Sequence, residues 1–138
     1  MRVMTETPVI HELARARCLE LLEAGSIGRV AVTRHGVPHI VPVNYVVADE
    51  WIVFRSGAGT KEEVAEMERP MSFEIDRFDE SDRTGWSVLV SGPSEVVTDP
   101  AELERIAGHH LDVWAPGARP HTVRLRLDLV SGREISRH

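Results

Sequence analysis

The stretch that decides the fold is W-I-V-F-R-S-G-A-G-T-K-E-E-V, residues 51–64. An apolar run typical of a strand ends at a turn with two glycines, and the turn opens into a helical pattern. Cations, hydroxyls and glycines follow one another in this turn: Arg55, Ser56, Gly57, Gly59, Thr60 and Lys61. Cationic side chains, hydroxyls and free backbone N–H groups together predict a cradle for a phosphate.

The same turn has a simpler explanation that the residues leave open. Thr60, three residues before Glu63, is typical of a helix N-cap, so the glycines could serve only to form the turn before that helix. The two interpretations are compatible. A nucleoside triphosphatase loop is a poor fit, because the first glycine of the G-x-x-x-x-G-K pattern is absent.

Length and composition limit the class of protein. At 138 residues and 42% hydrophobic, the chain is expected to form a single domain over residues 1–138 that buries its own core. A net charge of −6 argues against nucleic acid and anionic membrane as partners. Cys18 is the only cysteine, which excludes an internal disulfide, and neither a signal peptide nor a membrane-spanning run is visible. We expect a soluble, cytoplasmic protein.

Hydrophobic periodicity predicts mostly strands. The expected elements are a helix over 13–23, strands over 28–33, 39–47 and 51–55, a helix over 61–67, a strand over 71–75, an acidic loop through 82, a strand or bent hairpin arm over 86–97, a helix over 101–107 and a strand over 123–129. About six short strands with few helices between them favour a mainly β, antiparallel barrel over a doubly wound sheet.

Three local patterns give sharper expectations. Asp99 before Pro100 is typical of a helix start. Alternation in V-R-L-R-L-D-L, residues 123–129, predicts that its four apolar side chains all face the core. Cys18 falls on the apolar face of the first helix, where a buried, unreactive thiol is expected.

The sequence shows no catalytic group and no metal ligand set. His109, His110, His121 and His138 lack the spacing of a metal site, no serine has a nucleophile elbow, and the acidic residues 76–83 lack the pattern of a calcium loop. Two tryptophans are more informative. Trp86 and Trp114 lie beside glycine or proline, where a large ring covers a flat ligand or an interface, although core packing explains them equally well.

Five motifs occur together in a recognisable order: C-L-E-L-L-E-A-G-S-I-G-R-V-A-V (18–32), G-V-P-H-I-V-P-V-N-Y-V-V (36–47), I-V-F-R-S-G-A-G-T-K (52–61), G-W-S-V-L-V-S-G (85–92) and W-A-P-G-A-R-P-H (114–121). In this order they resemble the pyridoxamine 5'-phosphate oxidase-like, FMN-binding split-barrel family, in its short actinobacterial-type branch. The resemblance covers residues 13–135. It implies a six-stranded antiparallel split β-barrel of the FMN-binding type and a homodimer with two flavin sites at its interface.

The resemblance also implies which residues hold the cofactor. Strand residues would follow the flavin ring and ribityl chain, the glycine turn would bind the chain and phosphate, and tryptophans of the partner subunit would cover the ring. The residues implied are, in that order, Pro42, Val43, Asn44 and Tyr45; Arg55, Ser56, Gly59, Thr60 and Lys61; and Trp86 and Trp114.

The implied function is a flavin-dependent oxidoreductase that acts on a small organic acceptor, with FMN or a deazaflavin as cofactor. The competing class is a non-catalytic split barrel that stores or senses a flavin or haem, or a relative without cofactor. Pyridoxal phosphate synthesis is not expected, because the paired basic element after the flavin strand and the C-terminal substrate motif of true pyridoxamine 5'-phosphate oxidases are missing.

Overall fold

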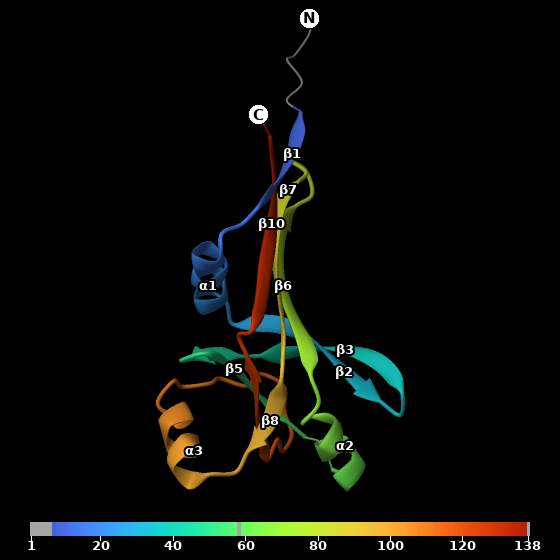
Figure 1. Ribbon diagram of the computed structural model, residues 1–138, viewed down its shortest axis with the longest axis vertical. Helices are drawn as coiled ribbons and strands as arrows, with labels where there is room; N and C mark the ends of the chain where they lie inside the picture. The colour runs from blue at the N-terminus through green and yellow to red at the C-terminus, as the bar shows by residue number, and fades with distance from the viewer. Residues whose placement is uncertain (1–6, 58, 138) are drawn as a thin grey trace, which may run out of the picture.

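The computed structural model describes residues 7–57 and 59–137 (Figure 1). Short helices lie around two antiparallel sheets, so the mainly β prediction is confirmed. The elements are β1 (Pro8–Glu12), α1 (Arg15–Ala24), β2 (Ile27–Arg34), β3 (Val37–Asn44), β4 (Val46–Ala48), β5 (Trp51–Ser56), α2 (Lys61–Glu66), β6 (Met71–Asp79), β7 (Thr84–Gly92), β8 (Ser94–Val97), α3 (Pro100–Ala107), β9 (His121–Arg126) and β10 (Leu129–Arg137).

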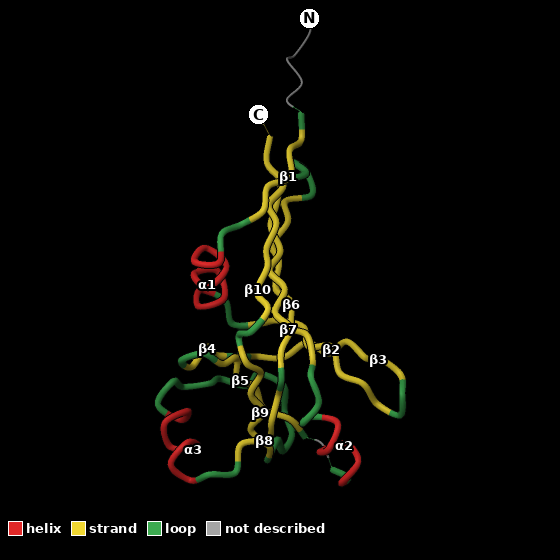
Figure 2. Tube along the Cα trace, in the orientation of Figure 1, coloured by secondary structure: helices red, strands yellow, loops and turns green. Residues whose placement is uncertain are grey.

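The larger sheet has the order β1-β10-β7-β6-β2-β3. Its strands β6, β7 and β10 form a long arm that rises from the body of the molecule, as Figure 2 shows. The predicted strand 71–75 continues to Asp79, because β6 pairs with β7 along its whole length, from Met71 opposite Gly92 to Asp79 opposite Thr84. The predicted acidic loop is therefore only a turn at the tip of this hairpin.

That turn is closed by Asp79. Its Oδ1 accepts hydrogen bonds from the backbone N–H groups of Ser81, at 3.0 Å, and Asp82, at 3.1 Å. These bonds stabilise the carboxylate and lower the pKa of Asp79. The acidic residues at this tip thus have a structural role.

The smaller sheet has the order β4-β5-β9-β8. Val123 and Leu125 of β9 are fully buried, and Leu127 is 7% exposed, as the alternation predicts. The prediction for Leu129 is wrong, since this side chain is 70% exposed. The reason is topological: β9 ends at Arg126, and Leu129 begins β10, which belongs to the other sheet.

The expected count of six strands is also wrong, because the described residues form ten strands. Periodicity missed β1, missed all of β10 except Leu129, and joined two pairs of strands. The predicted strand 39–47 is split at Tyr45, whose N–H donates to the Ser26 carbonyl at 3.1 Å. The predicted arm 86–97 is split at Pro93, where the chain passes from the larger sheet to the smaller one.

The two short helices begin where their capping residues predict. Thr60 Oγ1 accepts from the Glu63 N–H at 3.0 Å and starts α2, and the Asp99 carboxylate accepts from the Glu102 N–H at 3.4 Å and starts α3. The capping interpretation of the glycine turn is therefore confirmed. Within residues 7–57 and 59–137, no helix is long and apolar enough to cross a membrane.

The main core lies between the two sheets and under α1, and Phe73, Ile52 and Leu22 are among its largest buried side chains. Cys18 of α1 is fully buried, as expected. Its burial raises the pKa of the thiol, so this cysteine stays protonated and unreactive near neutral pH.

Candidate functional site

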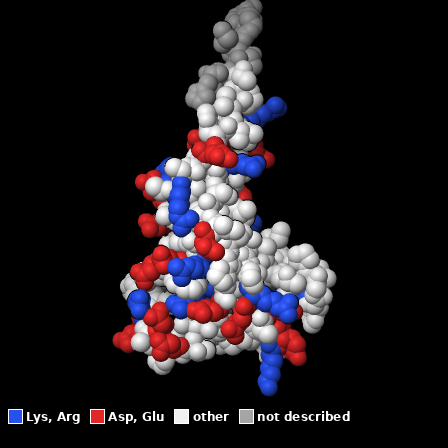
Figure 3. All heavy atoms as spheres, viewed as in Figure 1, with Lys and Arg blue, Asp and Glu red and all other residues white. Residues whose placement is uncertain are grey.

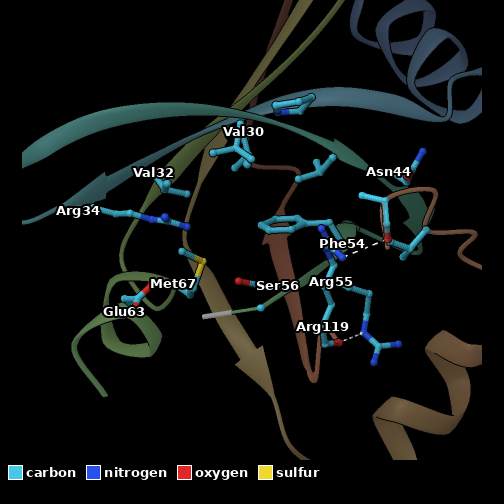
Figure 4. Close-up of a pocket in the computed structure, with 16 residues that line it drawn as sticks. Val30, Val32, Arg34, Asn44, Phe54, Arg55, Ser56, Glu63, Met67 and Arg119 are labelled. Atoms are coloured by element: carbon cyan, nitrogen blue, oxygen red, sulfur yellow. Dashed lines mark hydrogen bonds between the residues drawn. The ribbon is translucent and has the colours of Figure 1, made fainter. Parts of the chain in front are cut away.

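A cavity of about 280 Å³ opens between β2 and β3 of the larger sheet and β5 of the smaller sheet (Figure 4). Its lining includes the apolar side chains of Val30, Val32, Val41, Val43, Phe54 and Met67. The other contributions are mainly polar and include Arg34, Asn44, Arg55, Ser56, Glu63 and Arg119. The lining thus combines an apolar surface with three arginines, one carboxylate and two neutral polar side chains.

The apolar part of the lining follows from the alternation of side chains along the strands. Val30 and Val32, two residues apart on β2, are 2% and 4% exposed, and Phe54 of β5 is 2% exposed. These side chains pack in the main core and present their outer surfaces to the cavity. A wall built on three strands of two sheets is rigid, which suits a planar ligand.

Two arginines of the cavity lining are held in place by backbone carbonyls. Arg55 Nε donates to the carbonyl of Arg119 at 3.1 Å. Arg119 Nη1 in turn lies 3.2, 3.1 and 3.3 Å from the carbonyls of Ala115, Pro116 and Gly117. The loop before β9 is therefore folded around the Arg119 guanidinium, and this guanidinium orients the loop beside Arg55.

Asn44 connects the same loop to β3. Its Oδ1 accepts from the backbone N–H of Trp114 at 2.9 Å, and its Nδ2 donates to the Ser26 carbonyl at 3.4 Å. The Trp114 side chain is 63% exposed, so it is not a core residue. This arrangement holds the loop over one end of the cavity and leaves the indole accessible.

Several residues predicted from sequence come together here. Pro42, Val43, Asn44, Arg55 and Ser56 all line the cavity. The structure does not bring Gly59, Thr60 and Lys61 into this lining, because they lie exposed at the start of α2. Two later residues do line the cavity: Glu63 within α2 and Met67 at its end. Ala58 of the same turn lies outside the described residues.

Tyr45 is placed differently from the other predicted strand residues. Its ring is 2% exposed and packs edge-on against Phe73 with 4.8 Å between ring centroids. The hydroxyl donates to the Leu22 carbonyl at 2.6 Å, and burial raises the pKa of Tyr45 to about 12. Because β3 ends at Asn44, the next side chain turns into the core instead of lining the cavity.

Trp86 lies on β7, half-buried against the main core and outside the cavity lining of its own chain. His109 and His110 lie exposed just after α3, and His138 lies outside the described residues. No group of three His, Cys, Asp or Glu side chains in the part of the chain that the structure describes is arranged to hold a metal ion.

Sequence reasoning missed Arg34, a cationic residue of this cavity. In Figure 4 its side chain extends from the end of β2 into the cavity. The Nε atom is buried, and no hydrogen bond or ion pair joins the Arg34 side chain to another described residue. The signal was its spacing: Arg34 follows Val30 and Val32 at intervals of two residues, so it shares their inward face.

The chain matches the family model described as pyridoxamine 5'-phosphate oxidase over residues 14–134. It belongs to the pyridoxamine 5'-phosphate oxidase family. The resemblance inferred from the five motifs is therefore confirmed for nearly the whole chain, including the strands and turn that build the cavity.

Among its relatives is the uncharacterized protein Rv0080 of Mycobacterium tuberculosis, 33% identical in an alignment of 131 residues that covers 91% of this chain and 86% of the relative. A solved structure of an FAD-binding protein from Mycobacterium smegmatis is 32% identical, with a TM-score of 0.74 over 90% of this chain and 98% of the other. An FAD-binding protein from Mesorhizobium loti is 26% identical, with a TM-score of 0.75 and coverages of 94% and 99%.

Proposed function

We propose that this protein is a homodimeric flavin-dependent oxidoreductase that binds FMN and acts on a small organic acceptor. The observation that carries the proposal is the cavity between the two sheets, whose lining combines apolar strand side chains, suited to a flavin ring, with arginine, serine and asparagine side chains, suited to the polar chain and phosphate of a flavin nucleotide. The similarity to two solved proteins named as FAD-binding supports the binding of a flavin.

The residues fit the parts of this ligand. Val30, Val43 and Phe54 offer a rigid apolar surface for the ring, and Ser56 and Arg55 offer donors for the chain that carries the phosphate. The exposed start of α2, with Thr60 and Lys61, is proposed to bind the phosphate at the rim of the cavity. A flavin, when bound, supplies hydride and electron transfer, and the protein residues bind and orient it.

This chain has an exposed apolar surface beside the cavity that a partner subunit could cover. Val37 and Ile40 of the β2–β3 hairpin are 54% and 73% exposed, and Trp114 is 63% exposed. In Figure 3 the projecting hairpin is largely free of the charged groups that cover the rest of the visible face. A second copy that buries these side chains would also close the cavity, which supports a shared site.

Reconstitution tests the proposal. We would titrate apoprotein with FMN, FAD and a deazaflavin coenzyme, and then follow reoxidation of the reduced cofactor with quinone, nitro-aromatic and enone acceptors. Micromolar or tighter binding with acceptor-dependent turnover is expected. Binding without turnover would support the storage or sensing alternative, and absence of binding to all three cofactors would refute the proposal.

A further inference from the structure

Among the arginines that line the cavity, Arg34 is distinguished by a side chain for which the described residues provide no hydrogen-bond or ion-pair partner. Arg55 and Arg119 donate to carbonyls, whereas no described residue accepts from Arg34. Its Nε atom is buried. A buried donor of a charged group without an acceptor is unfavourable, so a ligand that supplies the acceptor gains that free energy on binding.

The position of Arg34 indicates which part of a ligand it meets. The next residue, His35, donates its backbone N–H to Glu66 Oε1 of α2 at 3.1 Å, so the end of β2 lies against α2. Arg34 therefore enters the cavity at the α2 end, beside Met67 and Glu63. This point lies at the last turn of α2, about 8 Å along the six-residue helix from Thr60 and Lys61, which begin it, and apart from Asn44 under the Trp114 loop.

Two carboxylates of α2 face the same region. Glu63 lines the cavity, and Glu66 has a buried Oε2 without a hydrogen-bond partner. Neither forms an ion pair with Arg34. Their charges reduce the attraction of this end for anions, so Arg34 is the cation that offsets them and allows an anionic group to enter.

We propose that Arg34 is a specificity residue that binds the phosphate of the nucleotide ligand, so that the cavity selects phosphorylated flavins over riboflavin. The assignment rests on the proposed flavin function. A planar guanidinium matches two phosphate oxygens at once, which favours this residue over a point charge for the task. Arg34 comes from β2 and Arg55 from β5, so donors from both sheets would converge on the ligand.

The test compares Arg34→Met, which removes the guanidinium and keeps an unbranched apolar side chain in place of its stem, with Arg34→Lys and with Arg17→Met. Arg17 is a matched control, since it lies on the exposed surface of α1 and, among the described residues, pairs with Glu20 alone. Affinities of the full-length apoproteins for FMN, FAD and riboflavin are measured by flavin fluorescence. Thermal stabilisation by inorganic pyrophosphate gives a second readout that needs no flavin, and circular dichroism verifies folding.

We expect Arg34→Met to weaken FMN and FAD binding about 10- to 100-fold and to leave riboflavin within about twofold, as for the loss of a charge-assisted hydrogen bond. It should also abolish the pyrophosphate effect, with Arg34→Lys intermediate and Arg17→Met unchanged. Equal losses for FMN and riboflavin, or no loss, in a folded variant would overturn the assignment while the flavin function stands. Arg34-dependent pyrophosphate binding without any flavin binding would instead refute the flavin function and keep the anion site.

Discussion

Replacing Tyr45 by phenylalanine tests whether this residue belongs to the core or to the cofactor site. Tyr45 Oη donates to the Leu22 carbonyl at 2.6 Å in a region where the ring is 2% exposed. The substitution removes this donor and keeps the packing against Phe73. We expect the free energy of unfolding to fall and the affinity for FMN to stay the same.

The size of the effect follows from what remains around the carbonyl. A buried acceptor left without any partner costs about 1–3 kcal/mol. The Leu22 carbonyl also accepts from the Gly25 N–H at 3.3 Å, so it keeps one bond in the variant. We therefore expect a loss of about 1–2 kcal/mol, which corresponds to a fall in Tm of about 3–8 °C for a domain of this size.

The pH dependence gives a second measure of the same burial. The pKa of Tyr45 is raised to about 12, whereas an unfolded tyrosine ionises near pH 10. Unfolding releases this proton between these two values, so the stability of the wild type is retained below about pH 10 and falls as pH rises toward about 12, by at most about 1.4 kcal/mol per pH unit. The phenylalanine variant lacks this contribution.

Urea unfolding at pH 7 and pH 11, together with FMN titration, decides whether Tyr45 serves the core or the cofactor site. The stability difference between the two proteins should be smaller at pH 11 than at pH 7. If Tyr45→Phe leaves unfolding unchanged at pH 7 and lowers the affinity for FMN several-fold, the hydroxyl serves the cofactor and the argument from the core is refuted.

Further outcomes test the proposed site. Lys61→Ala should weaken FMN binding about 10- to 100-fold and spare riboflavin; equal losses for both would show that Lys61 does not bind the phosphate. Light scattering should report about twice 15.4 kDa, and a monomer that holds flavin tightly would contradict the shared site. Cys18→Ala, His109→Gln and His110→Asn should leave turnover within severalfold of wild type, far from the roughly 10²–10⁴-fold loss of a general acid or base; an inactive variant with cofactor bound would reopen the search for a catalytic group.

Local features of the fold were predictable where a single residue fixes the backbone. Thr60 and Asp99 start helices because their side chains accept from N–H groups three residues later, an interaction that needs no distant partner. The inward faces of β2 and β9 follow from alternation for the same reason. Strand ends were harder to predict. Asp79 still lies in a strand because β7 pairs with it, and that pairing leaves no mark on the local sequence.

The sequence by itself determined the family, the mainly β class and the residues of the glycine turn, because ordered motifs and short-range hydrogen bonds are written along the chain. Only the tertiary structure decided which neighbours on one strand meet the cavity. Asn44 lines the cavity and Tyr45 fills the core, although the two are adjacent in a single apolar motif. Arg34 likewise became a site residue only when α2 packed against the end of β2. The reason is physical: burial and unpaired donors depend on contacts between segments far apart in the chain, and strand periodicity gives a side chain its face without saying what lies opposite that face.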